Sequence, residues 1–206
     1  MNAAESIIMS GKSGLDKCGY LEIICGPMFS GKTSKLLEVY TQYKYCDVPV
    51  LVVNYTGDTR YSTTRLSTHD DRQIPCIFIE RLRDIEDNSD TLSLLSKCKV
   101  ILINEGQFFD DLYDWVKHQV DQEGKRVFVA GLDGDFRRQA FGDMLRLIPI
   151  ADKVTKLQSI CSSCRNGTPG LFSHRKTLEQ KQKMIGADVY VPLCRSCYLS
   201  LNDLPK

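Results

Sequence analysis

Short apolar runs and amphipathic stretches alternate along most of the chain. The apolar runs, which are typical of buried strands, occupy residues 20–25, 49–55, 74–80, 99–104 and 126–133. Between them, apolar side chains recur at helical spacing over residues 31–46, 82–97 and 110–123. Strands that alternate with helices predict an α/β fold with a mostly parallel, helix-covered sheet.

Three segments are less regular. Residues 56–73 are polar and predict a long loop, of a length that is often functional. Residues 141–151 fit a helix or coil, and residues 154–161 are expected to be extended.

The same pattern predicts three parts along the chain. Residues 1–18 lack periodicity and predict a flexible N-terminal arm, whereas residues 19–160 hold the alternating strands and helices. From residue 161 the chain is polar, rich in Gly and Lys, and framed by cysteine pairs. Residues 161–206 are therefore expected to form a separate small domain.

Composition and charge narrow the class of protein. Of 206 residues, 42% are hydrophobic and 26% are charged, which is an ordinary globular mixture. A net charge of +1 argues against a general binder of nucleic acid or membrane surfaces, which relies on a positive field. No apolar run approaches the roughly 20 residues that span a bilayer, and the first residues do not resemble a signal peptide. We expect a soluble cytoplasmic protein.

The strongest chemical signal joins the first predicted strand to the first predicted helix. It fits G-x-x-x-x-G-K-[ST] and consists of Gly26, Pro27, Met28, Phe29, Ser30, Gly31, Lys32 and Thr33. Such a loop curls so that its N–H groups, and the positive end of the helix, meet a phosphate. Lys32 is expected to reach the β- and γ-phosphates of ATP, and the Thr33 hydroxyl to bind Mg²⁺. The alternative, an ordinary glycine-rich turn, is disfavoured by the flanking strand and helix.

A second signal ends the strand at 99–104. Ligands of open α/β sheets bind at the carboxyl ends of the strands, where Asn104 and Glu105 fall. A carboxylate there can accept the proton of a hydroxyl that attacks the γ-phosphate, although a solvated loop Glu is the plain alternative. P-loop enzymes commonly hold Mg²⁺ with an Asp on such a strand, so Asn104 removes a charge.

Four of the nine cysteines form two close pairs, Cys161-x-x-Cys164 and Cys194-x-x-Cys197. Two such pairs predict a tetrahedral zinc site of the structural type, with no open position for catalysis. Four unrelated core or redox thiols are the weaker alternative. The other cysteines are scattered, as is typical of a reducing compartment.

Weaker signals lie around these motifs. Asp58 and Arg60 are candidates for contacts to Mg²⁺-bound water and to phosphate, or form a plain surface ion pair. Three apolar residues belong either to the core or to an apolar slot for a flat base, namely Leu132, Phe136 and Phe141.

Taken together, these strings resemble the type II thymidine kinases, the zinc-containing family of cellular, bacterial and poxviral enzymes. The segments GPMFSGKT, DTRYS, THD, EGQFF, AGLDGDFRRQAFG and IGADVYVPLCRSC occur in that family's order, from about Tyr20 to Tyr198. An ordered set of this kind is far more specific than the phosphate-loop motif alone.

The resemblance implies a RecA-like P-loop domain and a small C-terminal zinc-binding lasso domain, assembled as a homotetramer. It implies transfer of the γ-phosphoryl group of ATP, with Mg²⁺, to the 5′-hydroxyl of thymidine, giving dTMP. One structural Zn²⁺ per chain and feedback inhibition by dTTP are also implied. No partner nucleic acid or membrane is expected.

By the same resemblance, Glu105 is the general base. The residues that bind ATP are those of the phosphate loop together with Asp58, Thr59, Arg60, Asn104 and Gln107. The residues around thymidine are Met28, Leu132, Phe136, Phe141, Lys183, Met184, Ile185, Gly186 and Tyr190. Asn104 departs from the family's usual Asp.

Two other functions fit parts of the sequence. A RecA-like ATPase motor on nucleic acid would use the cysteine module as a zinc ribbon, but it predicts a basic stripe that the net charge of +1 disfavours. A non-catalytic nucleotide switch predicts no base beside the γ-phosphate, which Glu105 disfavours.

Overall fold

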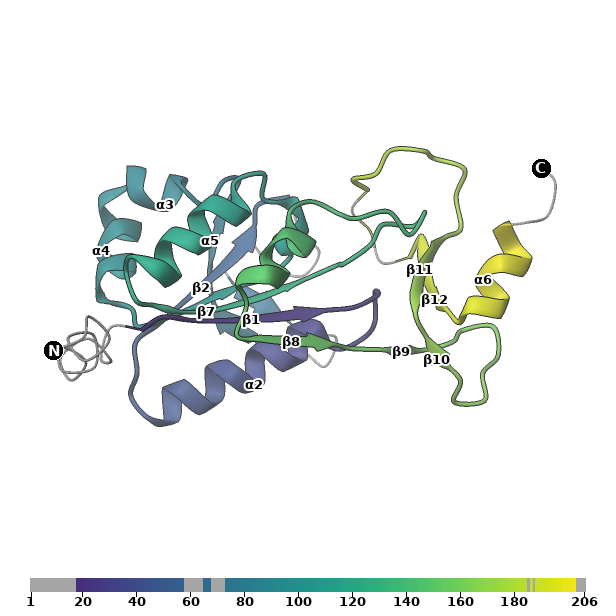
Figure 1. Cartoon of the computed structure of the whole chain (residues 1–206), viewed down its shortest axis with the longest axis horizontal. Coiled ribbons are helices and arrows are strands. Elements are labelled where there is room, and N and C mark those ends of the chain that lie inside the picture. The colour runs from purple at the N-terminus through teal and green to yellow at the C-terminus, as the bar shows by residue number, and fades with distance from the viewer. Residues whose placement is uncertain (1–17, 58–64, 68–72, 185, 187, 203–206) are drawn as a thin grey trace, which may run out of the picture.

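The computed structural model describes residues 18–57, 65–67, 73–184, 186 and 188–202 (Figure 1). Within this part of the chain, no helix is both long and apolar enough to cross a membrane.

A six-stranded parallel sheet forms the centre of the molecule, in the order β5-β2-β6-β7-β1-β8. Its strands are β1 (Tyr20–Cys25), β2 (Val50–Tyr55), β5 (Ile77–Ile79), β6 (Val100–Ile103), β7 (Arg126–Gly131) and β8 (Lys153–Lys156). Strand β7 lies between β1 and β6, and it pairs with both. The loops after β1 and β6 therefore leave the same edge of the sheet, one strand apart.

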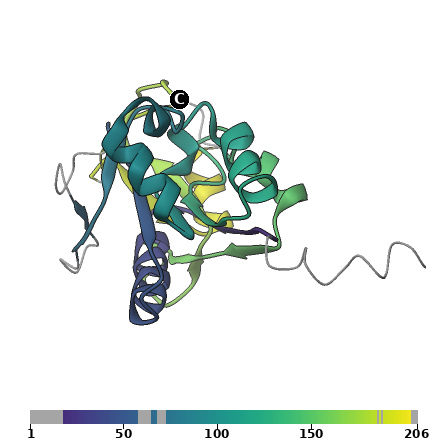
Figure 2. The same cartoon turned by 90° about the vertical axis from the view of Figure 1, so that its left-hand side faces the viewer.

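Helices cover both faces of the sheet (Figures 1 and 2). One face carries α2 (Lys32–Tyr45). The other carries α3 (Asp84–Asp87), α4 (Ser89–Lys97), α5 (Leu112–Asp121) and the 3₁₀ helix η3 (Met144–Ile150). Successive side chains of a strand point to opposite faces, so Ile23 packs with the second group of helices and Ile24 packs with α2. The predicted α/β fold is confirmed.

Two predicted elements are divided in the structure. The strand expected at 74–80 is β4 (Gln73–Pro75), which pairs antiparallel with β3 (Arg65–Ser67), followed by β5. Pro75 has no N–H to extend a ladder, and the chain changes partner after it. The helix expected at 82–97 breaks at Asn88, whose extended backbone and side chain cap α4 through the N–H groups of Asp90 and Thr91.

The ambiguous stretch at 141–151 contains η3, in which Pro149 lies. The extended stretch at 154–161 contains most of β8 and the short β9 (Ser159–Ile160). Of the long polar segment at 56–73, the described part includes β3.

The C-terminal part builds a small unit on the cysteine pairs. Its elements are β10 (Pro169–Gly170), β11 (Phe172–Arg175), β12 (Tyr190–Leu193) and α6 (Arg195–Asn202). Strand β10 pairs with β9, and β11 pairs with β12, both antiparallel. Residues 176–189, the lasso, connect β11 to β12. The division into 19–160 and 161–206 stays a prediction, and the pairing of β9 with β10 crosses its boundary.

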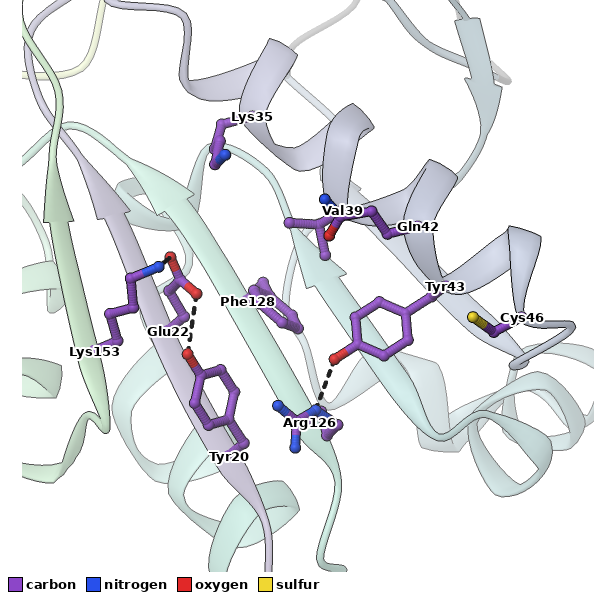
Figure 3. Close-up of a pocket in the computed structure, with 10 residues that line it drawn as sticks. All are labelled: Tyr20, Glu22, Lys35, Val39, Gln42, Tyr43, Cys46, Arg126, Phe128 and Lys153. Carbon is purple, nitrogen blue, oxygen red and sulfur yellow. Dashed lines mark hydrogen bonds and ion pairs between the residues drawn. The ribbon is translucent and has the colours of Figure 1, made fainter.

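A hollow of about 460 Å³ lies beside α2, over strands β1, β7 and β8 (Figure 3). Among the residues that line it, the buried Glu22 of β1 accepts hydrogen bonds from Tyr20 and Thr155. Glu22 also forms an ion pair with Lys153. Since Lys153 and Thr155 belong to β8, this network fastens the edge strand to β1 through side chains.

Candidate functional site

The loop after β1 has the backbone that its motif predicts. Gly26 and Gly31 have φ of 144° and 84°, values that glycine adopts readily. A Cβ on Gly26 would lie 2.4 Å from the Leu157 carbonyl oxygen, so space also requires glycine there. Helix α2 begins at Lys32 without a side-chain cap. Its first N–H groups therefore lack the side-chain partner that a capped helix has, and they suit an anion.

The polar groups of this loop fit a nucleotide phosphate. The Ser30 hydroxyl oxygen is buried and has no hydrogen-bond partner among the described residues. Lys32 Nζ lies across the loop and donates to the Pro27 carbonyl at 2.6 Å. A phosphate oxygen would give the Ser30 hydroxyl an acceptor. It would also compete with the Pro27 carbonyl for the Lys32 ammonium, because a hydrogen bond to a charged acceptor is stronger.

The end of β6 carries an amide in contact with this loop. Thr33 Oγ1 donates to Asn104 Oδ1 at 3.4 Å, and Asn104 Nδ2 donates to Asn54 Oδ1 at 3.0 Å. The Thr33 hydroxyl and the Asn104 carbonyl both offer oxygen ligands that suit Mg²⁺, but neither carries a charge.

Glu105 follows in a left-handed backbone conformation, with φ of 56° and ψ of 38°, at the start of the 3₁₀ helix η2 (Gly106–Phe108). Gln107 Nε2 donates to Glu105 Oε2 at 2.6 Å, while Gln107 Oε1 accepts from the Leu132 N–H at 2.9 Å. Gln107 is only 1% exposed. The end of β7 thus orients the Gln107 amide, and that amide orients the carboxylate. The prediction that Gln107 contacts ATP stays a prediction.

The apolar candidates differ in exposure. Met28, Leu132 and Phe136 are half-buried, whereas Phe141 is buried and packs edge-on against Phe108 with centroids 5.5 Å apart. The first three therefore have surface to offer a flat ligand, whereas Phe141 packs in the core beside Phe108.

A buried arginine holds the lasso. The Arg175 guanidinium donates to the carbonyls of Glu179, Lys181 and Gln182 and to the Tyr190 hydroxyl. It also lies 3.8 Å from the centroid of the Phe136 ring. The Tyr190 hydroxyl in turn donates to the Met184 carbonyl at 3.2 Å. These bonds occupy carbonyls on both sides of Lys183.

Three further contacts attach the lasso to the sheet domain. Arg137 Nη2 donates to Gln180, and Gln182 Nε2 donates to Asp135 Oδ2. Lys183 forms an exposed ion pair with Asp110 at 3.2 Å.

The phosphate loop itself touches the C-terminal unit. The Met28 N–H donates to Ser173 Oγ at 2.9 Å, and Ser173 is 5% exposed on β11. The Tyr198 hydroxyl of α6 donates to the Phe136 carbonyl at 2.6 Å. Sequence reasoning missed Ser173, because one serine in a polar segment carries no signal until β11 turns it toward the loop.

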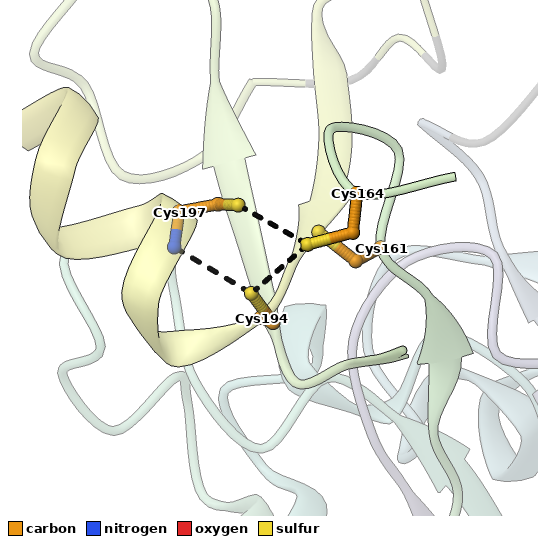
Figure 4. A group of neighbouring side chains, drawn as sticks. All are labelled: Cys161, Cys164, Cys194 and Cys197. Carbon is orange, nitrogen blue, oxygen red and sulfur yellow. Dashed lines mark hydrogen bonds between the residues drawn. The ribbon is translucent and has the colours of Figure 1, made fainter. Parts of the chain in front are cut away.

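The four paired cysteines converge, with all four sulfur atoms within 4.8 Å of one another (Figure 4). Burial raises the pKa of Cys161, but hydrogen bonds from backbone N–H groups outweigh it and lower that pKa to about 6. Hydrogen bonds with Cys197, Cys161 and Cys194 raise the pKa of Cys164 to about 12. Four thiols at this spacing fit a tetrahedral divalent ion, and this cluster can hold the predicted zinc.

A sequence model described as thymidine kinase matches residues 19–198. The chain belongs to the thymidine kinase family.

Relatives in plants, viruses and mammals bear the family's name. The thymidine kinase of Oryza sativa subsp. japonica is 43% identical over 183 residues, covering 88% of this chain and 66% of the relative. That of Yaba monkey tumor virus is 38% identical, covering 91% of this chain and 98% of the relative. The cytosolic thymidine kinase of Bos taurus is 37% identical, covering 87% of this chain and 72% of the relative. The family resemblance seen in the sequence is confirmed.

Some predicted residues of this thymidine kinase family member lie outside the described part of the chain. They are Asp58, Thr59, Arg60 and Ile185. Gly186 is described, with φ of 153°. The predicted roles of all these residues stay predictions.

Proposed function

We propose that this chain transfers the γ-phosphoryl group of ATP to the 5′-hydroxyl of thymidine and so produces dTMP. One observation carries the proposal. The phosphate loop after β1 and Glu105 after β6 leave the same edge of the sheet one strand apart, in a chain that matches the thymidine kinase family. A phosphate donor and a base on one edge suit transfer to a hydroxyl between them.

The residues of the phosphate loop would hold the nucleotide. Backbone N–H groups at the start of α2 and the Lys32 ammonium would bind the phosphates, and the Thr33 hydroxyl with Asn104 would hold Mg²⁺. Bound Mg²⁺ would neutralise charge that develops on the phosphate oxygens. Asp58, Thr59 and Arg60 are proposed further ATP contacts.

Glu105 would accept the proton of the attacking 5′-hydroxyl. Its support is the short bond from Gln107, which restrains the carboxylate at the edge of the sheet. A base must lie within hydrogen-bond reach of the proton that it removes, and restraint of this kind serves that need.

Thymidine would lie between the sheet domain and the lasso. The half-buried side chains of Met28, Leu132 and Phe136 suit the faces of a pyrimidine. Phe141, which is buried beside Phe108, would complete this apolar site from the core. Backbone groups of residues 183–186 would pair with the polar edge of the base. Tyr190 would fix the lasso at Met184.

The remaining proposals concern the whole protein. We propose one structural Zn²⁺ on the four cysteines, feedback inhibition by dTTP, a homotetramer, and a cytoplasmic location. The support is the cysteine cluster for zinc and the family for the others.

A nucleoside panel tests the function. Purified protein with ATP and Mg²⁺ should phosphorylate thymidine and release stoichiometric ADP, whereas adenosine should not be phosphorylated. The control is ATP hydrolysis with and without single-stranded DNA, which a nucleic-acid motor would accelerate. Stimulation by DNA without transfer to thymidine would overturn the proposal, and nucleotide binding without either reaction would point to a switch.

A further inference from the structure

Two buried asparagines meet behind the phosphate loop. Strands β2 and β6 are neighbours, with Val53 paired to Ile103, so Asn54 and Asn104 are the next residues in register. They are 2% and 3% exposed. Asn104 Nδ2 donates to Asn54 Oδ1 at 3.0 Å.

In this contact Asn104 turns the nitrogen end of its amide toward Asn54 and the oxygen end toward the phosphate loop. A carboxamide has a donor end and an acceptor end, unlike a carboxylate, whose two oxygens are equivalent. Because Nδ2 is bonded to Asn54, Oδ1 turns toward the Thr33 hydroxyl, 3.4 Å away. The hydroxyl then donates its proton to Asn104 and keeps its lone pairs for a cation.

The opposite orientation would not serve a metal. With the amide reversed, Nδ2 would donate to the Thr33 oxygen, occupy one of its two lone pairs and leave the hydroxyl proton without the Asn104 acceptor. The positive end of the amide dipole would also face the cation. An Asp at position 104 would not need orienting, since either oxygen could accept from Thr33.

We propose that Asn54 is a positioning residue for the nucleotide's Mg²⁺, required because position 104 is an amide. Asn54 acts by holding Asn104 with its carbonyl oxygen toward Thr33. The inference rests on the proposed function only in that the phosphate loop must bind a metal-nucleotide complex.

A double-mutant cycle tests this coupling. The variants are Asn54→Leu, which has similar size and no acceptor, Asn104→Asp, and the two combined. Binding of Mn²⁺ to each protein with saturating ADP is measured from the electron paramagnetic resonance of free Mn²⁺. Binding of ADP in excess chelator is measured in parallel, and thermal unfolding confirms that each variant is folded.

Asn54→Leu should weaken Mn²⁺ binding about 10-fold or more, the usual effect of removing a group that orients a ligand, and should leave metal-free ADP binding unchanged. In the Asn104→Asp background the same change should have little effect, because a carboxylate has no wrong end. Asn104→Asp alone should bind Mn²⁺ more tightly than the parent, since it adds a charge.

Asn54→Asp is the matched control. A carboxylate can only accept, so it keeps the bond from Asn104 Nδ2 and should retain Mn²⁺ binding. If leucine impairs folding, Asn54→Ala replaces it in both backgrounds, because alanine also lacks the acceptor and adds no charge.

An equal loss of Mn²⁺ binding from Asn54→Leu in both backgrounds would overturn the inference, because Asn54 would then be merely structural. Unchanged binding in Asn54→Leu and Asn54→Ala would overturn it as well. In either case the proposed function would stand. Failure of the unmodified protein to bind ADP would overturn both.

Discussion

At the scale of single residues, Glu105 is one of several non-glycine residues of the described chain whose backbone departs from ordinary geometry. A φ of 56° is uncommon for a residue with a side chain, and such strain often occurs at functional sites. Here the left-handed turn lets η2 begin at once, which brings Gln107 back under the carboxylate.

Glu105→Gln should fold normally and bind ATP but lose phosphoryl transfer. A well-placed general base contributes about 10²- to 10⁴-fold to the rate, and the amide cannot take its proton. Initial rates of thymidine phosphorylation, with nucleotide affinity measured beside them, check this. Turnover above about a third of the parent's would mean that Glu105 is not the base.

The sequence could predict candidate residues where a motif lies next to a strand that the apolar pattern also predicts. Glu105 and Lys32 follow strands that the apolar pattern reveals. Asn54 and Ser173 could not be predicted, because each contacts a partner that is distant in the sequence. Asn54 accepts a hydrogen bond from Asn104, and Ser173 accepts one from the Met28 N–H. A lone polar residue in a strand is uninformative until register and facing are known.

At the scale of elements, side-chain contacts stabilise the edge strand β8, which has backbone hydrogen bonds on one side. Among the strands that the structure describes, β8 is at the edge of the sheet and pairs only with β1. Burial raises the pKa of Glu22, but hydrogen bonds from Lys153, Thr155 and Tyr20 outweigh it and hold that pKa below its usual value.

Glu22→Gln should therefore lower stability in a pH-dependent way. A carboxyl with a depressed pKa in the folded state stabilises the protein above its unfolded pKa of about 4.3, and that contribution disappears as the pH falls through the folded value. The difference in unfolding free energy between parent and variant should be largest near neutral pH and shrink below about pH 4.

Urea unfolding at several pH values measures this difference. The matched control is Glu38→Gln, which breaks an exposed ion pair with Lys35. A Glu22→Gln deficit that persisted unchanged in acid would show that packing, and not charge, is responsible.

Arg175→Met should raise the KM for thymidine about 10-fold while leaving the KM for ATP nearly unchanged. The lasso would lose its anchor, and a hydrogen bond to a charged group such as the guanidinium contributes about 1.5–3 kcal/mol. Arg175→Lys should restore only part of the affinity, since an ammonium has fewer donors and no planar fork. Steady-state kinetics for both substrates test this. An unchanged thymidine KM would remove Arg175 from any role in substrate binding.

The division of predicted elements also has a physical cause. The apolar pattern over 82–97 is continuous, but Asn88 caps a new helix within it. Periodicity cannot reveal such a break, since a cap depends on backbone angles and not on hydrophobic spacing. The antiparallel pairing of β3 with β4 was equally hidden, because both partners are only three residues long.

At the scale of the whole molecule, the cysteine cluster holds together a unit that has little apolar core. Its buried apolar cluster consists of Cys161, Leu193, Cys194 and Tyr198. A core this small cannot by itself offset the entropy of ordering the surrounding chain, so an ion on the four cysteines would supply the missing stability.

Cys194→Ser should therefore abolish zinc binding and make residues 161–202 sensitive to trypsin, while far-ultraviolet circular dichroism retains the signature of the helix-covered sheet. Metal analysis of the parent should find one Zn²⁺ per chain. Active protein free of zinc would contradict the prediction.

The bond from the Met28 N–H to Ser173 Oγ joins the phosphate loop of the sheet to the C-terminal cysteine unit. The loop that is proposed to bind nucleotide is thereby held by the strand that carries Arg175, and Arg175 anchors the lasso. Whatever factor the nucleoside gains in affinity from bound nucleotide, the nucleotide must gain from bound nucleoside, because the coupling free energy is reciprocal. Ser173→Ala should reduce both factors equally, so neither ligand alone would reveal its effect.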